Sequence, residues 1–279
     1  MNRLFSPPPA SGLGLCILAL AACNNPEELS ASPPEPVTSV AQAASPGALF
    51  GVLCQKEYQN GWQDTLSWSW NHCQGLVDEL SSTDTKKFYW NLKDKKSRIE
   101  TPNDQDLVET VDLLYLKGHG GITSDATSAW WPMWNDGVGA FTINMALGNE
   151  AHGLSILSAH SCDTLYNGDK LMSSRWKKTL RGGVRYVTGA WDTMWDGWTT
   201  DEVGEDYADD LQDGLPFHEA WPDATSDWYA TQYQAVLATG ADKADCLSRL
   251  YFMSWKNYDQ FPRLANNAIH KWCMTQWVD

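Results

Sequence analysis

Two stretches of the chain decide the fold: residues 111–121 read VDLLYLKGHGG, and residues 154–163 read LSILSAHSCD. Each begins with a nearly continuous apolar run, which is typical of a strand buried on both faces of a parallel sheet. The first run ends close to His119 and the second close to Cys162. Because loops leave parallel strands at their carboxyl ends, the pattern predicts that these two side chains share one edge of the sheet.

Segments on both sides of these runs alternate between strand and helix patterns. Short apolar or alternating runs predict strands at 48–53, 87–92 and 184–187, and apolar spacing predicts helices at 66–80 and 170–180. Strands that alternate with helices favour an α/β fold. We therefore predict a three-layer αβα sandwich around a mostly parallel sheet.

The start of the chain predicts export. Arg3 precedes an apolar run at 13–22 that is too short to span a bilayer, so residues 1–22 are typical of a signal peptide. The tetrapeptide Leu-Ala-Ala-Cys that ends at Cys23 resembles the bacterial lipobox. This resemblance implies that Cys23 is lipidated and anchors the protein to a membrane. Cleavage followed by release is the alternative.

The rest of the chain divides into a tether and one domain. Residues 23–47 are rich in Pro, Ser, Ala and Glu and poor in aromatic residues, which predicts disorder. Residues 48–279 are enough for one α/β domain with a sizeable core. The formal net charge of -15 argues against nucleic acid as a partner. We expect a protein anchored in the bacterial cell envelope, at the outer membrane or cell surface, with secretion as the alternative.

Five cysteines follow the lipobox, and an odd number leaves at least one thiol unpaired. In an oxidising compartment, Cys54 could pair with Cys73 near the domain start, and Cys246 with Cys273 near its end. Cys162 would then stay free. The connectivity remains open, because four cysteines allow three pairings and a fully reduced chain is a further alternative.

The two strand ends carry residue types that suit covalent catalysis. A thiolate at Cys162 is a strong nucleophile, and the imidazole of His119 can take its proton and later protonate the leaving amine. The glycines after His119 let the backbone approach a substrate carbonyl. The amides of Gly120 and Cys162 are therefore candidates for an oxyanion hole. This chemistry requires no cofactor.

An apolar strand ending in His-Gly, followed by an apolar strand ending in a small residue and Cys, resembles the caspase, legumain, clostripain and gingipain group of cysteine peptidases. The match covers two short segments, and the order of strands and helices over residues 48–240 is compatible with it. The resemblance implies a caspase-like fold, His119 as general acid and base, Cys162 as nucleophile and Gly120 as oxyanion donor. The chain also resembles a family of Trp-rich bacterial proteins with this arrangement.

The chain departs from that group around the cysteine. Ser161 replaces the usual Ala, Asp163 stands where caspases carry Arg or Gly, and the caspase pentapeptide is absent. Specificity for aspartate is therefore not expected. A carboxylate at Asp163 is expected to raise the pKa of the neighbouring thiol, which leaves an inactive member of the fold as an alternative.

Acidic residues suggest a preference for basic peptides. Asp192 and Asp196 follow the strand predicted at 184–187 and are candidates for a specificity pocket, and the resemblance to clostripain suggests Lys or Arg at the cleavage position. Further carboxylates form two stripes on an expected helix: Asp201, Glu202, Glu205, Asp206, Asp209, Asp210 and Asp213. A solvated face is the first interpretation of these stripes. An acidic rim or a Ca²⁺ patch is the second.

Two other classes of function remain open. The 16 Trp residues motivate a non-enzymatic surface module that holds glycans or a partner protein through two loops, with Trp130, Trp131 and Trp134 in one and Trp191, Trp195 and Trp198 in the other. A metal-dependent hydrolase would bind zinc through His160, Cys162 and Asp163, with His119 or His152 completing the site. Neither CxxC nor HExxH spacing occurs, so we predict no metal site. The preferred prediction is a cysteine peptidase acting on a peptide or protein.

Overall fold

The computed structural model describes residues 47–58, 63–92, 99–100, 107–133, 139–148, 153–180, 183–226, 231–264, 268–269 and 271–278. The expected signal peptide, Cys23 and the expected tether up to residue 46 lie outside these ranges, as do Trp134 and His152. Among the described residues, every helix is too short or too polar to cross a membrane.

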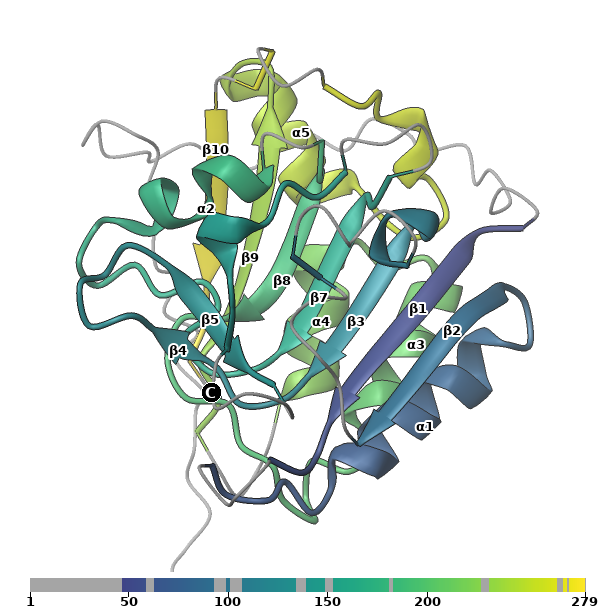
Figure 1. Ribbon diagram of the computed structural model, residues 1–279. Coiled ribbons are helices and arrows are strands. Elements are labelled where there is room, and N and C mark those ends of the chain that lie inside the picture. The colour runs from purple at the N-terminus through teal and green to yellow at the C-terminus, as the bar shows by residue number, and fades with distance from the viewer. Residues whose placement is uncertain are drawn as a thin grey trace, which may run out of the picture.

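A seven-stranded sheet forms the centre of the molecule (Figure 1). From one edge to the other it consists of β2 (Thr85–Leu92), β1 (Leu49–Gln55), β3 (Leu113–Lys117), β7 (Ile156–His160), β8 (Tyr186–Ala190), β9 (Gln234–Gly240) and β10 (Lys271–Gln276). The five strands from β2 to β8 run parallel, whereas β9 is antiparallel to both of its neighbours. The prediction of an α/β fold with a mostly parallel sheet is confirmed.

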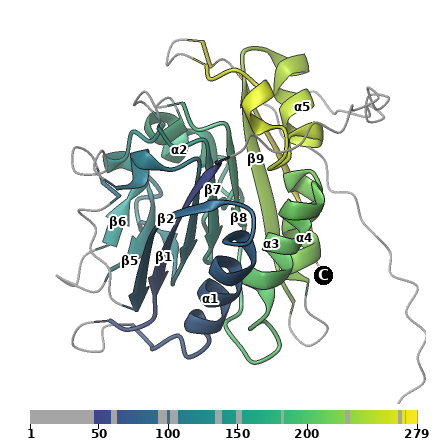
Figure 2. The same cartoon turned by 90° about the vertical axis from the view of Figure 1, so that its right-hand side faces the viewer.

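Both faces of this sheet are covered, which completes three layers (Figure 2). One face carries α1 (Ser69–Leu80), α3 (Val203–Asp213), α4 (Phe217–Thr225) and α5 (Lys243–Phe252). The other carries α2 (Met172–Leu180) and a small antiparallel sheet of β4 (Gly121–Ile122), β5 (Ala129–Pro132) and β6 (Gly139–Phe141). Single 3₁₀ turns lie at Val108–Thr110, Thr142–Asn144 and Tyr258–Gln260.

The apolar runs in the sequence follow from this double coverage. Along β3, Leu113 and Tyr115 enter the core under the four helices, whereas Leu114 and Leu116 enter the core on the opposite face. Every side chain of β3, β7 and β8 is buried. A strand that is buried on both faces has no solvated positions, so its sequence is mostly apolar rather than alternating.

Predicted and observed elements differ mainly at their starts. The helix expected from residue 170 begins at Met172, because Lys170 has a φ of 60°, which no residue in a right-handed helix adopts. The helix expected from residue 66 begins at Ser69, and the Leu66 amide before it donates to the Lys56 carbonyl.

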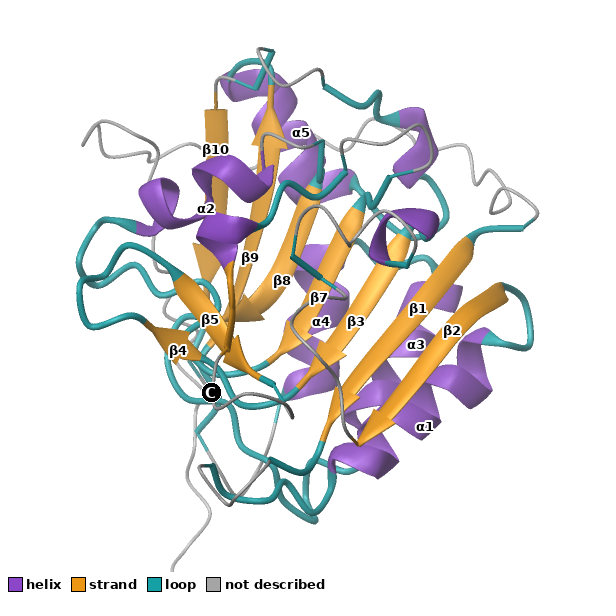
Figure 3. Cartoon of the chain, viewed as in Figure 1, coloured by secondary structure: helices purple, strands orange, loops and turns teal. Residues whose placement is uncertain are grey.

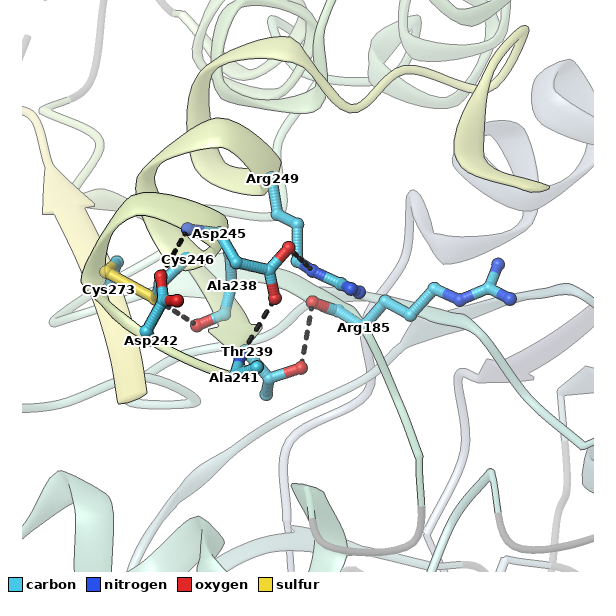
Figure 4. The surroundings of a disulfide bond; sticks show 9 residues. All are labelled: Arg185, Ala238, Thr239, Ala241, Asp242, Asp245, Cys246, Arg249 and Cys273. Carbon is cyan, nitrogen blue, oxygen red and sulfur yellow. Dashed lines mark hydrogen bonds and ion pairs between the residues drawn. A yellow bond between two sulfur atoms is a disulfide. The ribbon is translucent and has the colours of Figure 1, made fainter. Parts of the chain in front are cut away.

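Two disulfides join helices to the strands that they cover. Cys54 of β1 is bonded to Cys73 of α1, and Cys246 of α5 is bonded to Cys273 of β10 (Figure 4). Within the described chain, Cys162 is the free cysteine. The pairing suggested by the cysteine positions is confirmed. Because the bridges span 19 and 27 residues, each stabilises the fold by about 3 kcal/mol through restriction of the unfolded chain.

Candidate active site

The loops after β3 and β7 meet at the edge where the parallel strands end (Figure 3). These strands are neighbours, and Lys117 lies opposite His160 in their register. Two residues further along each loop stand His119 and Cys162. A Cβ at Gly120 would overlap the Ser161 hydroxyl and the Cys162 carbonyl oxygen, so the backbone beside His119 lies directly against the cysteine loop. The predicted dyad residues therefore share one edge of the sheet.

Two hydrogen bonds orient His119. Its amide donates to the Tyr58 hydroxyl at 3.0 Å, and its Nε2 lies 2.9 Å from the Asp64 carbonyl oxygen. Since a carbonyl oxygen can only accept, Nε2 carries the proton in this contact. The neutral ring then has its lone pair on Nδ1, which is the nitrogen able to act as a base.

The Cys162 thiol lies against the backbone of Met194. Its Sγ accepts a hydrogen bond from the Met194 amide at 3.3 Å and lies 3.6 Å from the Met194 carbonyl oxygen. Burial raises the pKa of Cys162 and outweighs the Met194 amide, which lowers it. Asp163 raises this pKa further, as expected from the sequence, and Lys117 lowers it. The resting thiol is therefore protonated at neutral pH and needs a base.

Two backbone amides at this edge have free donor capacity. Over the part of the chain that the structure describes, the Gly120 amide donates to no protein acceptor. The amide of Cys162 contacts only its own sulfur within the same described residues. Both donors are thus available to a substrate carbonyl whose oxygen gains negative charge during attack by sulfur.

The two carboxylates expected in a specificity pocket have different environments. Asp196 is 8 % exposed, its Oδ1 lies 3.0 Å from Lys117 Nζ, and its Oδ2 accepts from the Trp68 amide at 3.2 Å. Because a buried ammonium neutralises it, Asp196 does not present a free charge to a basic substrate, contrary to the expectation. Asp192 is only partly buried, and its Oδ1 accepts from the Thr193 amide.

A buried polar cluster that the sequence analysis missed surrounds Lys117. Its Nζ lies 2.7 Å from Nδ1 of His160, whose ring is 4.6 Å from that of His72. Nε2 of His72 lies 3.7 Å from Asp196 Oδ1. Burial, followed by the charge of Lys117, lowers the pKa of both histidines, so both rings are neutral. The sequence carried one signal of this cluster: a lysine ends an apolar strand. A buried charge without a partner is costly, so this lysine needs polar neighbours.

The same contacts concern the alternative in which His160, Cys162 and Asp163 bind zinc. Nδ1 of His160 faces an ammonium, and Asp163 lies in the next loop with a backbone amide that donates to the Asp192 carbonyl. Among the described residues, no group of three or more His, Cys, Asp and Glu side chains is placed to hold a metal ion.

An open pocket of about 570 Å³ adjoins the segment that contacts the thiol. It is lined by Thr193, Trp195, Gly197, Trp198, Thr199, Thr231 and Tyr233. Among the tryptophans of the two expected binding loops, Trp195 and Trp198 are 53 % and 66 % exposed. Trp131 is buried, and the Trp191 ring donates to the Trp277 carbonyl. The described lining consists of aromatic rings, hydroxyls and a glycine. No side chain in this described lining is charged, and exposed indole rings can stack on apolar or aromatic groups and can also attract a cation.

The acidic stripes lie on α3 and just before it. Glu202, Glu205, Asp206, Asp209 and Asp213 are exposed, and the opposite side of the helix packs into the core through Val203, Tyr207, Ala208 and Leu211. These exposed carboxylates form a solvated face, which was the first interpretation of the stripes.

One protein-family model matches most of this chain. The model described as "Domain of unknown function (DUF6345)" matches residues 55–274. The matched span contains both candidate catalytic loops and the strands from β2 to β9. Comparison with curated proteins finds no match.

Proposed function

The chain belongs to the DUF6345 family, and we propose that it is a cysteine peptidase that uses Cys162 as nucleophile and His119 as general acid and base. The observation that carries the proposal is that a thiol, an oriented imidazole and two available amides all lie in the loops that directly follow the neighbouring strands β3 and β7. In the proposed mechanism Nδ1 of His119, whose Nε2 is held by the Asp64 carbonyl, serves as the general base for the thiol.

The proposed reaction has two halves. Nδ1 of His119 takes the Cys162 proton as Sγ attacks the peptide carbonyl carbon, and the Gly120 and Cys162 amides stabilise the resulting oxyanion. The carbonyl re-forms, the C–N bond breaks, and the imidazolium protonates the leaving amine. His119 then deprotonates a water that attacks the thioester. This second half releases a carboxylic acid and restores the thiol.

The Asp64 carbonyl contributes in both halves. It accepts from Nε2, so it favours the imidazolium that forms when Nδ1 gains a proton. It also prevents the ring from turning away, because rotation would break a 2.9 Å contact. Since this acceptor is a backbone group, its identity is not visible as a sequence motif.

The cleavage preference rests on the groups beside Cys162. The expected preference for Lys or Arg depended on Asp192 and Asp196, and Lys117 neutralises Asp196. Asp192 still supports that preference, whereas the pocket, whose described lining carries no charged side chain, also accommodates a neutral side chain. Parallel peptide series with basic and with aromatic or aliphatic residues at the cleavage position separate the two.

The test is hydrolysis of these fluorogenic peptides by the full chain and by Cys162→Ala and His119→Ala. We expect each variant to lose at least roughly a thousandfold in kcat/KM, with thermal unfolding unchanged. Wild-type protein alkylated at Cys162 is the matched control, because it lacks the thiol without any change of sequence. Undiminished hydrolysis in either variant rules out the dyad.

A second candidate function is favoured by the exposure of Trp195 and Trp198 at the pocket. Two exposed indoles beside hydroxyl groups form a surface that stacks on sugar rings or on aromatic side chains. A non-enzymatic module of this kind would bind a glycan or peptide equally well in Cys162→Ala. Binding that is lost after alkylation of the thiol would argue against it.

We also propose that this protein acts outside the cytoplasm with a lipid at Cys23. The two disulfides support an oxidising compartment. Incorporation of a fatty-acid probe into the wild-type chain, and its loss in Cys23→Ser, is the expected result. Equal labelling of both chains would contradict the anchor.

A further inference from the structure

Lys117 is a buried ammonium that the proposed reaction leaves without a role. Its side chain is 2 % exposed and ends between Asp196 Oδ1 at 3.0 Å and His160 Nδ1 at 2.7 Å. A buried ion pair is seldom more stable than well-packed apolar side chains of similar volume. The other residues of β3 are Leu and Tyr, so an apolar side chain would have suited this strand equally well.

Lys117 and Cys162 lie on the same side of the sheet. Side chains alternate along a strand, and His160 faces the helical layer, where its ring is 6.3 Å from that of Trp221. Cys162 stands two residues later and packs against the core of the same layer. Lys117 is the register partner of His160 and interacts electrostatically with the sulfur. The ammonium therefore lies on the helix-covered face of the sheet, in the same layer as the Cys162 sulfur.

The same ion pair anchors the segment that touches the thiol. Asp196 follows Met194 by two residues, and the Met194 amide donates to Sγ at 3.3 Å. A second bond, from the Trp68 amide to Oδ2, ties Asp196 to the start of α1. Lys117 thereby links the end of β3 to the segment around Met194, whose backbone contacts the sulfur.

We propose that Lys117 is a positioning residue for Cys162, and that its positive charge favours the thiolate that attacks the substrate. The inference rests on the proposed function, because it concerns the same nucleophile. Other titratable groups surround the thiol and Lys117: Asp163 on the cysteine loop, Asp192 and Asp196 after β8, Tyr58 after β1, His119 after β3, His160 on β7 and His72 on α1. Asp163 opposes the thiolate, and Lys117 favours it.

The test is the rate of alkylation of Cys162 by iodoacetamide as a function of pH. The full chain is kept non-reduced, and only the peptide containing Cys162 is scored by mass spectrometry. Lys117→Met keeps the length of the side chain and removes its charge. We expect roughly tenfold slower alkylation near pH 8, because loss of the ammonium raises the pKa of Cys162 and so lowers the thiolate fraction.

Asp196→Asn is the matched control, since it keeps the side-chain shape and leaves Lys117 without its counter-ion. A charge effect predicts alkylation as fast as in the wild type or faster. Slower alkylation in both single variants would indicate a packing role and overturn the proposal. The double variant Lys117→Met/Asp196→Asn leaves no buried carboxylate unpaired. It replaces Lys117→Met in the test if that single variant does not fold. Equal alkylation rates in the double variant and Asp196→Asn would also overturn the proposal.

The outcome is separable from that of the peptidase proposal. If hydrolysis requires Cys162 while alkylation is indifferent to Lys117, only the role of Lys117 is wrong. If Lys117 sets the alkylation rate and no peptide is hydrolysed, the peptidase proposal is wrong and Lys117 still tunes a reactive thiol.

Discussion

Nζ of Lys117 lies 2.7 Å from Nδ1 of His160, and the two residues face each other in the register of β3 and β7. An ammonium can only donate, so Nδ1 accepts and the ring of His160 stays neutral. The contact joins the charged end of β3 to the end of β7. It lies directly before the loops that carry His119 and Cys162, so it constrains where both loops begin.

Gly120→Ala is expected to disturb the edge of the sheet where these loops meet. Its methyl group would overlap the Ser161 hydroxyl and the Cys162 carbonyl oxygen, and the cysteine loop would have to move. We expect a loss of about 1–3 kcal/mol in unfolding free energy and roughly hundredfold lower kcat/KM. Gly118→Ala is the control, because its Cβ would meet only side-chain atoms, the Gln55 side chain at 3.2 Å and the Tyr58 hydroxyl at 3.6 Å, and no backbone of the cysteine loop. Equal losses in the two variants, measured by denaturant unfolding and peptide kinetics, would contradict this account.

Trp195→Ala tests the pocket. The side chain is 53 % exposed, so its removal should leave the unfolding temperature unchanged. We expect KM, or the dissociation constant of a bound peptide or glycan, to rise by roughly three- to tenfold through the loss of aromatic contacts. Trp70→Ala is the matched control: this indole is 39 % exposed, stacks on Tyr89 and does not line the pocket. A similar loss of affinity in both variants would show that the pocket is not the binding surface.

Asp210 is expected to make stability depend on pH. Burial, together with Asp223 and the other nearby carboxylates, raises its pKa from 3.8 to about 7. The folded chain therefore holds this proton more tightly than the unfolded chain. This contribution to stability is fully present below the unfolded pKa and is lost as the pH rises through about 7.

Asp210→Asn removes that dependence. We expect its unfolding temperature to exceed that of the wild type at pH 8, with the difference shrinking towards pH 4. Asp213→Asn removes an equal charge from an exposed position of α3 and should change the melting profile less. The prediction is tested by thermal unfolding from pH 4 to pH 8. If the difference in unfolding temperature between wild type and Asp210→Asn is the same across this range, the prediction is wrong.

The sequence by itself determined the layers, the disulfide candidates and the edge that carries the site. The stretch from Leu113 to Leu116 is apolar because both faces of β3 are covered, and this pattern depends on burial alone. His119 and Cys162 were recognisable because residues at the ends of neighbouring parallel strands must come together.

Only the tertiary structure decided which polar groups face one another. Asp196 was expected to meet a substrate, yet it meets Lys117, and the Asp64 carbonyl that orients His119 is a backbone group with no sequence signature. The free state of Cys162 likewise depended on which helices lie over which strands. Periodicity reports whether a side chain is buried, whereas the partner of a buried charge is set by chain segments far apart in the sequence.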